Sequence, residues 1–138
     1  MYKVIVSILL ILSVASVAVG QDDIEKLSEQ LAQAQLDAYN NRDLEAFLIP
    51  YADDVKVFEF PDKLQYTGKS RMSEIYGRMF VRTPDLHCHL VNRMVMGNTV
   101  IDQELVTIDK SQAPIRAIAI YKIENKKISE VYFIYDRN

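Results

Sequence analysis

The sequence has 138 residues, enough for one domain, and 49% of them are hydrophobic, so a packed core is feasible. Its 16 Lys and Arg residues against 19 Asp and Glu residues give a formal charge of −3, which argues against nucleic acid as a partner. The single cysteine excludes an internal disulfide bond.

The first 20 residues are typical of an export signal. Lys3 precedes an apolar run that reaches about Val19, and small residues stand at Ala18 and Gly20. The run is slightly short for a membrane span of ~20 residues, and no cluster of cations follows it. We therefore expect cleavage after Gly20, a domain over residues 21–138, and a secreted or periplasmic protein without membrane contact; a retained anchor is the alternative.

Helical periodicity dominates the first half of the domain. It predicts a helix over 22–41, a short helix over 44–48 after an N-cap at Asp43, and a third helix over 71–81 after Ser70. A strand over 55–60 interrupts the helices.

The second half has the period-two pattern of strands. "LHCHLVNRMVM" and "TVIDQELVTID" flank the turn "GN", and "PIRAIAIYKIE" and "KISEVYFIYD" flank the turn "NK". Helices followed by two hairpins indicate an α+β domain, with the helices packed on one face of a mostly antiparallel sheet.

A turn at Gly97-Asn98 fixes the first hairpin, placing Arg93 opposite Asp102 and Leu90 opposite Leu105. We expect the more apolar face to pack on the helices; it carries Cys88, Leu90, Asn92, Met94, Ile101, Gln103 and Leu105. The charged face would meet water or a partner subunit; it carries His87, His89, Arg93, Asp102 and Glu104. A register slip of one residue would exchange the two faces.

Four segments resemble a known family: "AYNNRDLEAFLIPYADDVKVFEFP", "YTGKSRMSEIYGRMF", "VNRMVMGNTVIDQE" and "AIAIYKIENKKISEVYFI". They look like the nuclear transport factor 2-like superfamily, and are most similar to its SnoaL-like and steroid delta-isomerase-like group. The resemblance implies a cone, in which a strongly curved sheet and three helices enclose a cavity.

The resemblance also implies site residues. In the isomerases of this superfamily a carboxylate removes a proton next to a carbonyl group, while a tyrosine and a protonated aspartic acid stabilise the oxyanion. The base falls on Glu59, but Gln35 stands at the tyrosine position and Ala119 at the aspartic acid position. Steroid isomerisation by that mechanism is therefore not expected.

Tyr76 and Gln103 are the other catalytic candidates that the resemblance implies. In close relatives a histidine stands where this chain has Gln103, and glutamine can only hydrogen-bond. The same alignment assigns the remaining ligand-binding wall to Tyr51, Val57, Ile75, Cys88, Leu105, Val131, Phe133 and Tyr135, and the expected hairpin register adds Asn92. This wall is mostly apolar and aromatic, as small-molecule pockets are.

Two further signals have simpler explanations than catalysis. His87 and His89 have a spacing that suits a metal, but in the expected register they lie on the outer face, and we expect no metal. Cys88 stands in an apolar strand and is expected to be a small core residue rather than a catalytic thiol. Phosphate-loop, nucleotide and nucleophile-triad motifs are absent, so no cofactor is expected.

Three functions stay open. The first is an enzyme acting on an apolar carbonyl compound, with Glu59 as base and Tyr76 or Gln103 holding the oxyanion, for isomerisation, aldol-type cyclisation or hydration. The second is a non-catalytic protein that binds a small apolar molecule in the same cavity. The third is an interaction module that forms a homodimer through the outer face of the sheet.

Overall fold

The computed structural model describes residues 20–136. The predicted export signal therefore lies almost entirely outside the described residues. The described elements are α1 (Gln21–Asn41), α2 (Leu44–Leu48), β1 (Tyr51–Glu59), β2 (Lys63–Thr67), α3 (Lys69–Arg82), β3 (His87–Met96), β4 (Thr99–Thr107), β5 (Ile115–Glu124) and β6 (Lys127–Tyr135).

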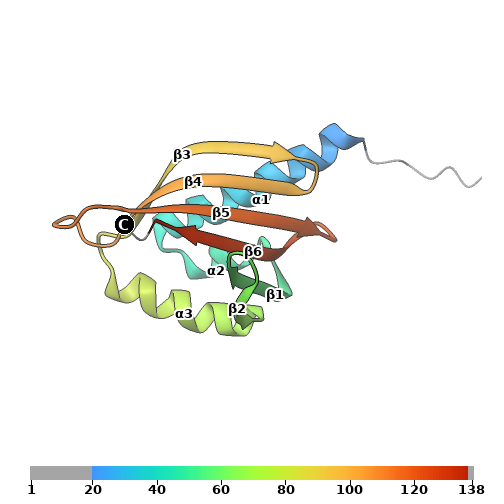
Figure 1. The fold of residues 1–138 in the computed structure, drawn as a ribbon. Helices are drawn as coiled ribbons and strands as arrows, with labels where there is room; N and C mark the ends of the chain where they lie inside the picture. The colour runs from blue at the N-terminus through green and yellow to red at the C-terminus, as the bar shows by residue number, and fades with distance from the viewer. Residues whose placement is uncertain (1–19, 137–138) are drawn as a thin grey trace, which may run out of the picture.

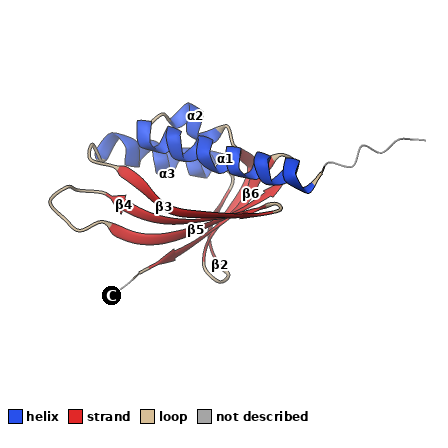
Figure 2. Ribbon diagram, turned by 90° about the horizontal axis from the view of Figure 1, so that it is seen from above, coloured by secondary structure: helices blue, strands red, loops and turns tan. Residues whose placement is uncertain are grey.

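The six strands form one sheet in the order β2-β1-β6-β5-β4-β3 (Figure 1). The β1–β6 pair is parallel and the other pairs are antiparallel. Figure 2 shows the three helices together on one face of the curved sheet. This is the predicted α+β, cone-shaped architecture.

The helices begin and end close to their predicted positions. The Asp43 carboxylate caps α2 by accepting a hydrogen bond of 3.0 Å from the backbone N–H of Ala46. α1 ends where Arg42 adopts a left-handed conformation with φ of 52°. Strand β1 starts at Tyr51, four residues earlier than expected, so that Tyr51 lies within the sheet.

The core lies between the helices and the inner face of the sheet. Its fully buried side chains come from every layer and include Phe47, Val55, Met72, Leu86, Val100, Ile128 and Val131. Removing this apolar surface from water is the main contribution to stability. Both predicted turns are confirmed, since Met96 pairs with Thr99 and Glu124 with Lys127.

The face assignment of the first hairpin is partly wrong. Arg93 does pair with Asp102, but the register shifts between Leu90 and Asn92, so that Leu90 lies opposite Glu104. Val91 is the extra residue, and this bulge reverses the alternation of the strand. Before the bulge, Cys88 and Leu90 face the helices, as predicted. After the bulge, Arg93 faces the helices.

The buried face of β4 is therefore the charged one. Asp102 is 0% exposed and Glu104 is 6% exposed, whereas Gln103 is exposed to solvent on the outer face. Asn92, Met94, Ile101 and Leu105 also lie on the outer face, contrary to the prediction. The physical reason is the Arg93–Asp102 pair: two opposite charges in bidentate contact can be buried together, which a single charge cannot.

Candidate functional site

A cavity of about 330 Å³ lies between the helices and the inner face of the sheet. Helices α1 and α3 and strands β1, β3, β4, β5 and β6 contribute to its wall. The lining residues are Gln35, Leu36, Tyr39, Tyr51, Tyr76, Met79, Cys88, Glu104, Val106, Ile108, Ile115, Ala117, Tyr121, Phe133 and Tyr135. The wall is apolar and aromatic, with a few polar groups, as in pockets for small organic molecules.

Six of the predicted wall or site residues line this cavity: Gln35, Tyr51, Tyr76, Cys88, Phe133 and Tyr135. Val57, Ala119 and Val131 are buried in the surrounding core, and Ile75 is half-buried on α3; none of these four lines the cavity. Asn92, Gln103 and Leu105 were expected on the cavity wall and lie on the outer face of the sheet, because the bulge in β3 fixes the opposite orientation.

Glu59 ends strand β1 and does not line the cavity. Its side chain is 27% exposed and its carboxylate lies 3.8 Å from the Lys63 ammonium. It is nevertheless close enough to the cavity mouth for its charge to raise the pKa of Tyr135. Glu59 is two residues after Val57, so it is on the same, inner face of β1. Its carboxylate lies beside the cavity and does not line it.

Glu104 is the carboxylate that does line the cavity. Burial, followed by the negative charge of Asp102 two residues away, raises the pKa of Glu104 from 4.5 to about 7. Hydrogen bonds with Cys88 and Tyr121 and the charge of Arg93 act in the opposite direction but do not offset burial. A carboxyl group with such a pKa can both accept and return a proton near neutral pH.

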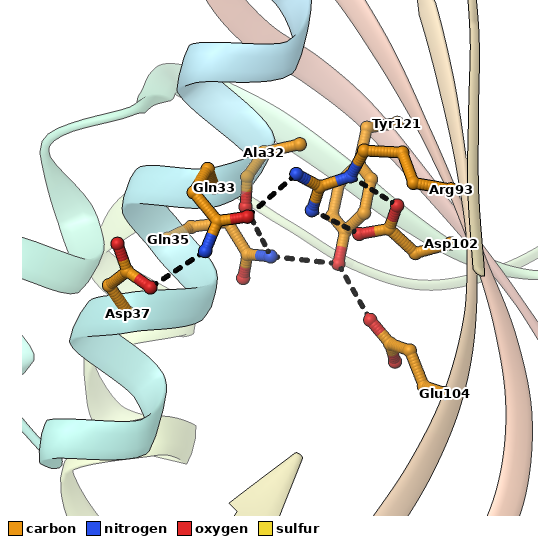
Figure 3. A network of polar contacts seen from close by, with 8 residues as sticks. All are labelled: Ala32, Gln33, Gln35, Asp37, Arg93, Asp102, Glu104 and Tyr121. Atoms are coloured by element: carbon orange, nitrogen blue, oxygen red, sulfur yellow. Dashed lines mark hydrogen bonds and ion pairs between the residues drawn. The ribbon is translucent and has the colours of Figure 1, made fainter. Parts of the chain in front are cut away.

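A chain of hydrogen bonds connects α1 to Glu104 (Figure 3). The Tyr51 hydroxyl donates to Gln35 Oε1 at 3.1 Å, and Gln35 Nε2 donates to the Tyr121 oxygen at 3.0 Å. The Tyr121 hydroxyl donates in turn to Glu104 Oε1 at 3.4 Å. Gln35 Nε2 also bonds Ala32 O at 3.1 Å, which fixes the amide orientation. The chain of donated hydrogen bonds therefore runs from Tyr51 through Gln35 and Tyr121 to Glu104.

A second network lies beside the first, between α1 and the inner face of the sheet (Figure 3). Arg93 donates from Nε and Nη2 to the two oxygens of Asp102, both at 2.7 Å, and from Nη1 to Gln33 Oε1 at 2.8 Å. Gln33 Nε2 is held by Asp37 at 2.7 Å. The guanidinium thus connects β3 to α1 and β4 and keeps the Asp102 charge in a fixed position beside Glu104.

The cavity phenols stay neutral over the physiological pH range. Burial raises the pKa values of Tyr39, Tyr51, Tyr76 and Tyr121, and the charge of Glu104 raises those of Tyr39, Tyr51 and Tyr121 further. They can therefore donate hydrogen bonds. The Tyr39 hydroxyl has only a weak acceptor, the thioether sulfur of Met79 at 3.9 Å, and this leaves it able to donate to a ligand oxygen.

Cys88 contributes to the wall but is a poor nucleophile. Burial and the neighbouring Glu104 charge raise the pKa of its thiol. The Asn40 amide holds its backbone at both ends, with 2.8 Å from Cys88 N to Oδ1 and 3.0 Å from Nδ2 to Cys88 O. These contacts anchor the start of β3 to α1, which favours the predicted structural role.

Sequence reasoning missed Glu104, Tyr39 and Tyr121. The Arg93–Asp102 pair was the sequence signal that could have indicated the burial of Glu104. Two opposite charges that neutralise each other can lie on the buried face. Glu104 is two residues after Asp102 on β4, so it lies on the same face. Tyr39 lies one helical turn after Gln35 on α1, so it occupies the same helix face.

The geometry offers no metal centre in residues 20–136, since no three His, Cys, Asp or Glu side chains gather there. His87 and His89 are exposed on β3, and Asp102 and Glu104 point to the opposite face. Within the same residues, none of the helices has the length and apolarity that a membrane crossing requires.

Solved structures with the same fold come from several bacteria. A cystatin-fold protein from Novosphingobium aromaticivorans is 26% identical, with a TM-score of 0.71 and coverage of 78% of this chain and 97% of that chain. A candidate ketosteroid isomerase from Kribbella flavida is 17% identical, with a TM-score of 0.70 and coverage of 83% and 81%. An LEH-like epoxide hydrolase from M. tuberculosis is 15% identical, with a TM-score of 0.70 and coverage of 81% and 84%.

A comparison with curated proteins finds no match. The model of the SnoaL-like domain matches residues 32–131, from the middle of α1 to the middle of β6, and this range holds all the cavity-lining residues except Phe133 and Tyr135. The chain belongs to the SnoaL-like family of the nuclear transport factor 2-like superfamily.

Proposed function

We propose that the protein binds a small, largely apolar carbonyl compound in its tyrosine-lined cavity and that Glu104 transfers a proton to and from carbon. The single observation that carries this proposal is the placement of Glu104, a 6% exposed carboxyl group on the wall of an apolar cavity. Its pKa of about 7 suits a general base and acid at neutral pH. The fold shared with a candidate ketosteroid isomerase also supports this reaction class.

The proposed reaction is an isomerisation without net oxidation or reduction. The Glu104 carboxylate removes a proton from the carbon next to the carbonyl group, and the C–H electron pair moves into an enolate. When the substrate carries a β,γ double bond, the enolate is conjugated with it, and the protonated Glu104 returns the proton at the γ-carbon while the double bond moves to the α,β position. In a saturated ketone the proton returns to the same carbon, and the only change is exchange with solvent. Tyr121 stays a donor to the carboxyl group throughout, because Gln35 occupies its oxygen as an acceptor.

The enolate oxygen needs a hydrogen-bond donor. We assign this role to Tyr39, whose hydroxyl has only the Met79 sulfur at 3.9 Å as an acceptor. Tyr76, which lines the cavity from α3, is the second candidate. Gln103 has no access to the cavity from the outer face and is not part of the proposed site.

Deuterium exchange tests the proposal directly. The full chain is incubated in D₂O with a series of enolisable cyclic ketones of different sizes, and deuterium at the α-carbon is followed by NMR. We expect Glu104→Gln to lower the exchange rate by about 10²- to 10⁴-fold, the usual contribution of a general base. The matched variant Glu59→Gln should lower it by less than about tenfold, since Glu59 lies beside the cavity. The converse result would return the role of base to Glu59.

A non-catalytic binding protein is the second candidate function. The observation that favours it is the complete hydrogen bonding of Tyr51, Gln35 and Tyr121, whose polar groups hold one another in place without a ligand. In that case ketones bind, and neither the wild type nor Glu104→Gln speeds exchange above the rate in buffer.

We also propose that the protein is an exported homodimer. Export rests on the sequence of the first 20 residues. The dimer proposal is based on an apolar patch on the outer face of the sheet, where Met94 and Met96 are 58% and 76% exposed. Its partly exposed members are Ile101, Leu105, Ile118, Ile120, Tyr132 and Ile134. On that face Arg116 pairs with Asp136 at 2.9 Å and Lys122 lies opposite Glu130. A second copy could therefore cover the patch without burying an excess of one charge.

A further inference from the structure

We propose that the ligand of this cavity is a compact, uncharged single-ring compound, and that organic anions and four-ring steroids are excluded from it. The inference rests on the proposed function of the same site, and it adds the size and charge of the molecule that the site accepts. It follows from the volume of the cavity, the acidic group on its wall, and the closure of its inner end.

The volume limits the size of the ligand. A cavity of about 330 Å³ is at the small end of ligand sites. A volume at this end of the range suits a ring with a short substituent better than a skeleton of several fused rings. A four-ring steroid would leave a large part of its skeleton outside the mouth.

The inner end of the cavity cannot lengthen to admit a larger molecule. Gln35, Tyr51 and Tyr121 are 3–4% exposed and hydrogen-bonded to one another, and Phe47 packs behind Tyr51 with ring centroids 5.2 Å apart. Moving any of them would break a buried hydrogen bond in a close-packed region. A longer ligand can extend only toward the mouth of the cavity, where Ile108 and Ile115 are 41% and 42% exposed.

The charges exclude anions. Of the described residues that line the cavity, Glu104 is the only one with an acidic or basic side chain other than phenols and the thiol. The Arg93 guanidinium does not line the cavity, and it donates hydrogen bonds to both oxygens of Asp102 and to Gln33. An anion would lie beside the buried Glu104 carboxylate, and the described residues of the wall include no cation to offset the repulsion, which is costly at low dielectric.

The aromatic wall favours a ring over a flexible chain. Tyr39, Tyr51, Tyr76, Tyr121 and Phe133 surround the space, with Tyr135 at the mouth. Flat rings pack against flat rings or against a saturated ring with large contact area and little loss of side-chain freedom. The same wall presents phenol donors, which suit a neutral carbonyl oxygen.

Three matched probes test the size and charge limits. 4-tert-Butylcyclohexanone is a neutral ring of the expected size, 4-tert-butylcyclohexanecarboxylate replaces its carbonyl group by an anion, and 5α-androstan-3-one fuses the same ketone ring to three others. Affinities are measured at pH 8 by isothermal titration calorimetry on the full chain. We expect the ring ketone to bind at least tenfold more tightly than either other probe.

Two variants locate the effect in the cavity. Glu104→Gln removes the charge but keeps the shape of the side chain. It should lower the ratio of the ketone affinity to the carboxylate affinity by fivefold or more. Ala117→Met fills part of the cavity and should weaken binding of the ring ketone at least tenfold, with circular dichroism confirming an intact fold.

Each unfavourable result has its own meaning. Equal binding of the steroid overturns the size limit, equal binding of the carboxylate overturns the charge limit, and no binding of any probe overturns the inference as a whole. None of these results depends on turnover, so they are distinct from failure of the proposed function, which is the absence of Glu104-dependent exchange with ketones of any size.

Discussion

Strand β4 presents two neighbouring residues of similar size to opposite environments: Glu104 is buried in the cavity and Gln103 is exposed on the outer face. Hydropathy alone would place the amide inside and the acid outside. The opposite arrangement arises because Arg93 and Asp102 neutralise each other on the inner face and Glu104 shares that face. The comparison teaches that pairing of charges, more than the average polarity of a face, decides which side of this hairpin is buried.

Breaking the buried pair should have the largest effect on stability. Arg93→Met leaves the Asp102 carboxylate, which is 0% exposed, without its cation, and an unpaired buried charge costs about 3–5 kcal/mol. We expect urea denaturation to show a loss of this size. The double variant Arg93→Met/Asp102→Leu removes both charges and should recover most of the loss. A loss below about 1 kcal/mol in the single variant would show that the inner face does not depend on the pair.

The pH dependence of stability sharpens the comparison between Glu104 and Gln103. The folded pKa of Glu104 is raised from 4.5 to about 7, so the folded protein binds this proton more tightly than the unfolded chain does. The contribution is fully present below pH 4.5 and is lost as pH rises through about 7. From the size of the shift, the loss amounts to about 3 kcal/mol.

Glu104→Gln isolates this contribution, because it removes no other titrating group. The difference in unfolding free energy between wild type and variant, measured by urea denaturation at pH 4.5 and pH 8.5, should change by about 3 kcal/mol in favour of the variant at the higher pH. A difference that is the same at both pH values would mean that Glu104 titrates as an ordinary surface carboxyl group.

A substitution on the outer face of the sheet should change the oligomeric state more than the stability of the fold. Ile120→Glu places a charge in the middle of the proposed dimer face, opposite Tyr132 on β6. We expect sedimentation to show a monomer, with a change in unfolding free energy of the monomer of about 1 kcal/mol or less. Val81→Glu is the matched control, because Val81 is 84% exposed on α3 and away from that face. A wild type that already sediments as a monomer contradicts the dimer proposal.

Much of the fold could be predicted from local patterns. The cap at Asp43, the turn at Gly97-Asn98 and the period-two strands gave elements, turns and the Arg93–Asp102 partnership correctly. These features depend on a few neighbouring residues, so periodicity and turn chemistry are sufficient to define them.

The candidate site was less accessible, because its orientation depends on one inserted residue. Val91 resembles any other strand residue, yet its bulge sets which side of β3 faces the cavity beyond that point. Gln35 and Tyr51 were placed correctly through their alignment with known cavity positions. Glu104 was not, because its burial depends on a long-range charge pair together with a local bulge.

The smallest expected effect completes the comparison on β4. Gln103→Ala removes an exposed amide from the outer face and should change the unfolding free energy by no more than about 0.5 kcal/mol, as surface substitutions usually do. Deuterium exchange should stay within about twofold of wild type, whereas Glu104→Gln one residue away loses it. A tenfold loss in Gln103→Ala would mean that the outer face acts on the cavity. Because β4 is a single layer of chain between the two faces, the proposed dimer face would then be the first place to look for that coupling.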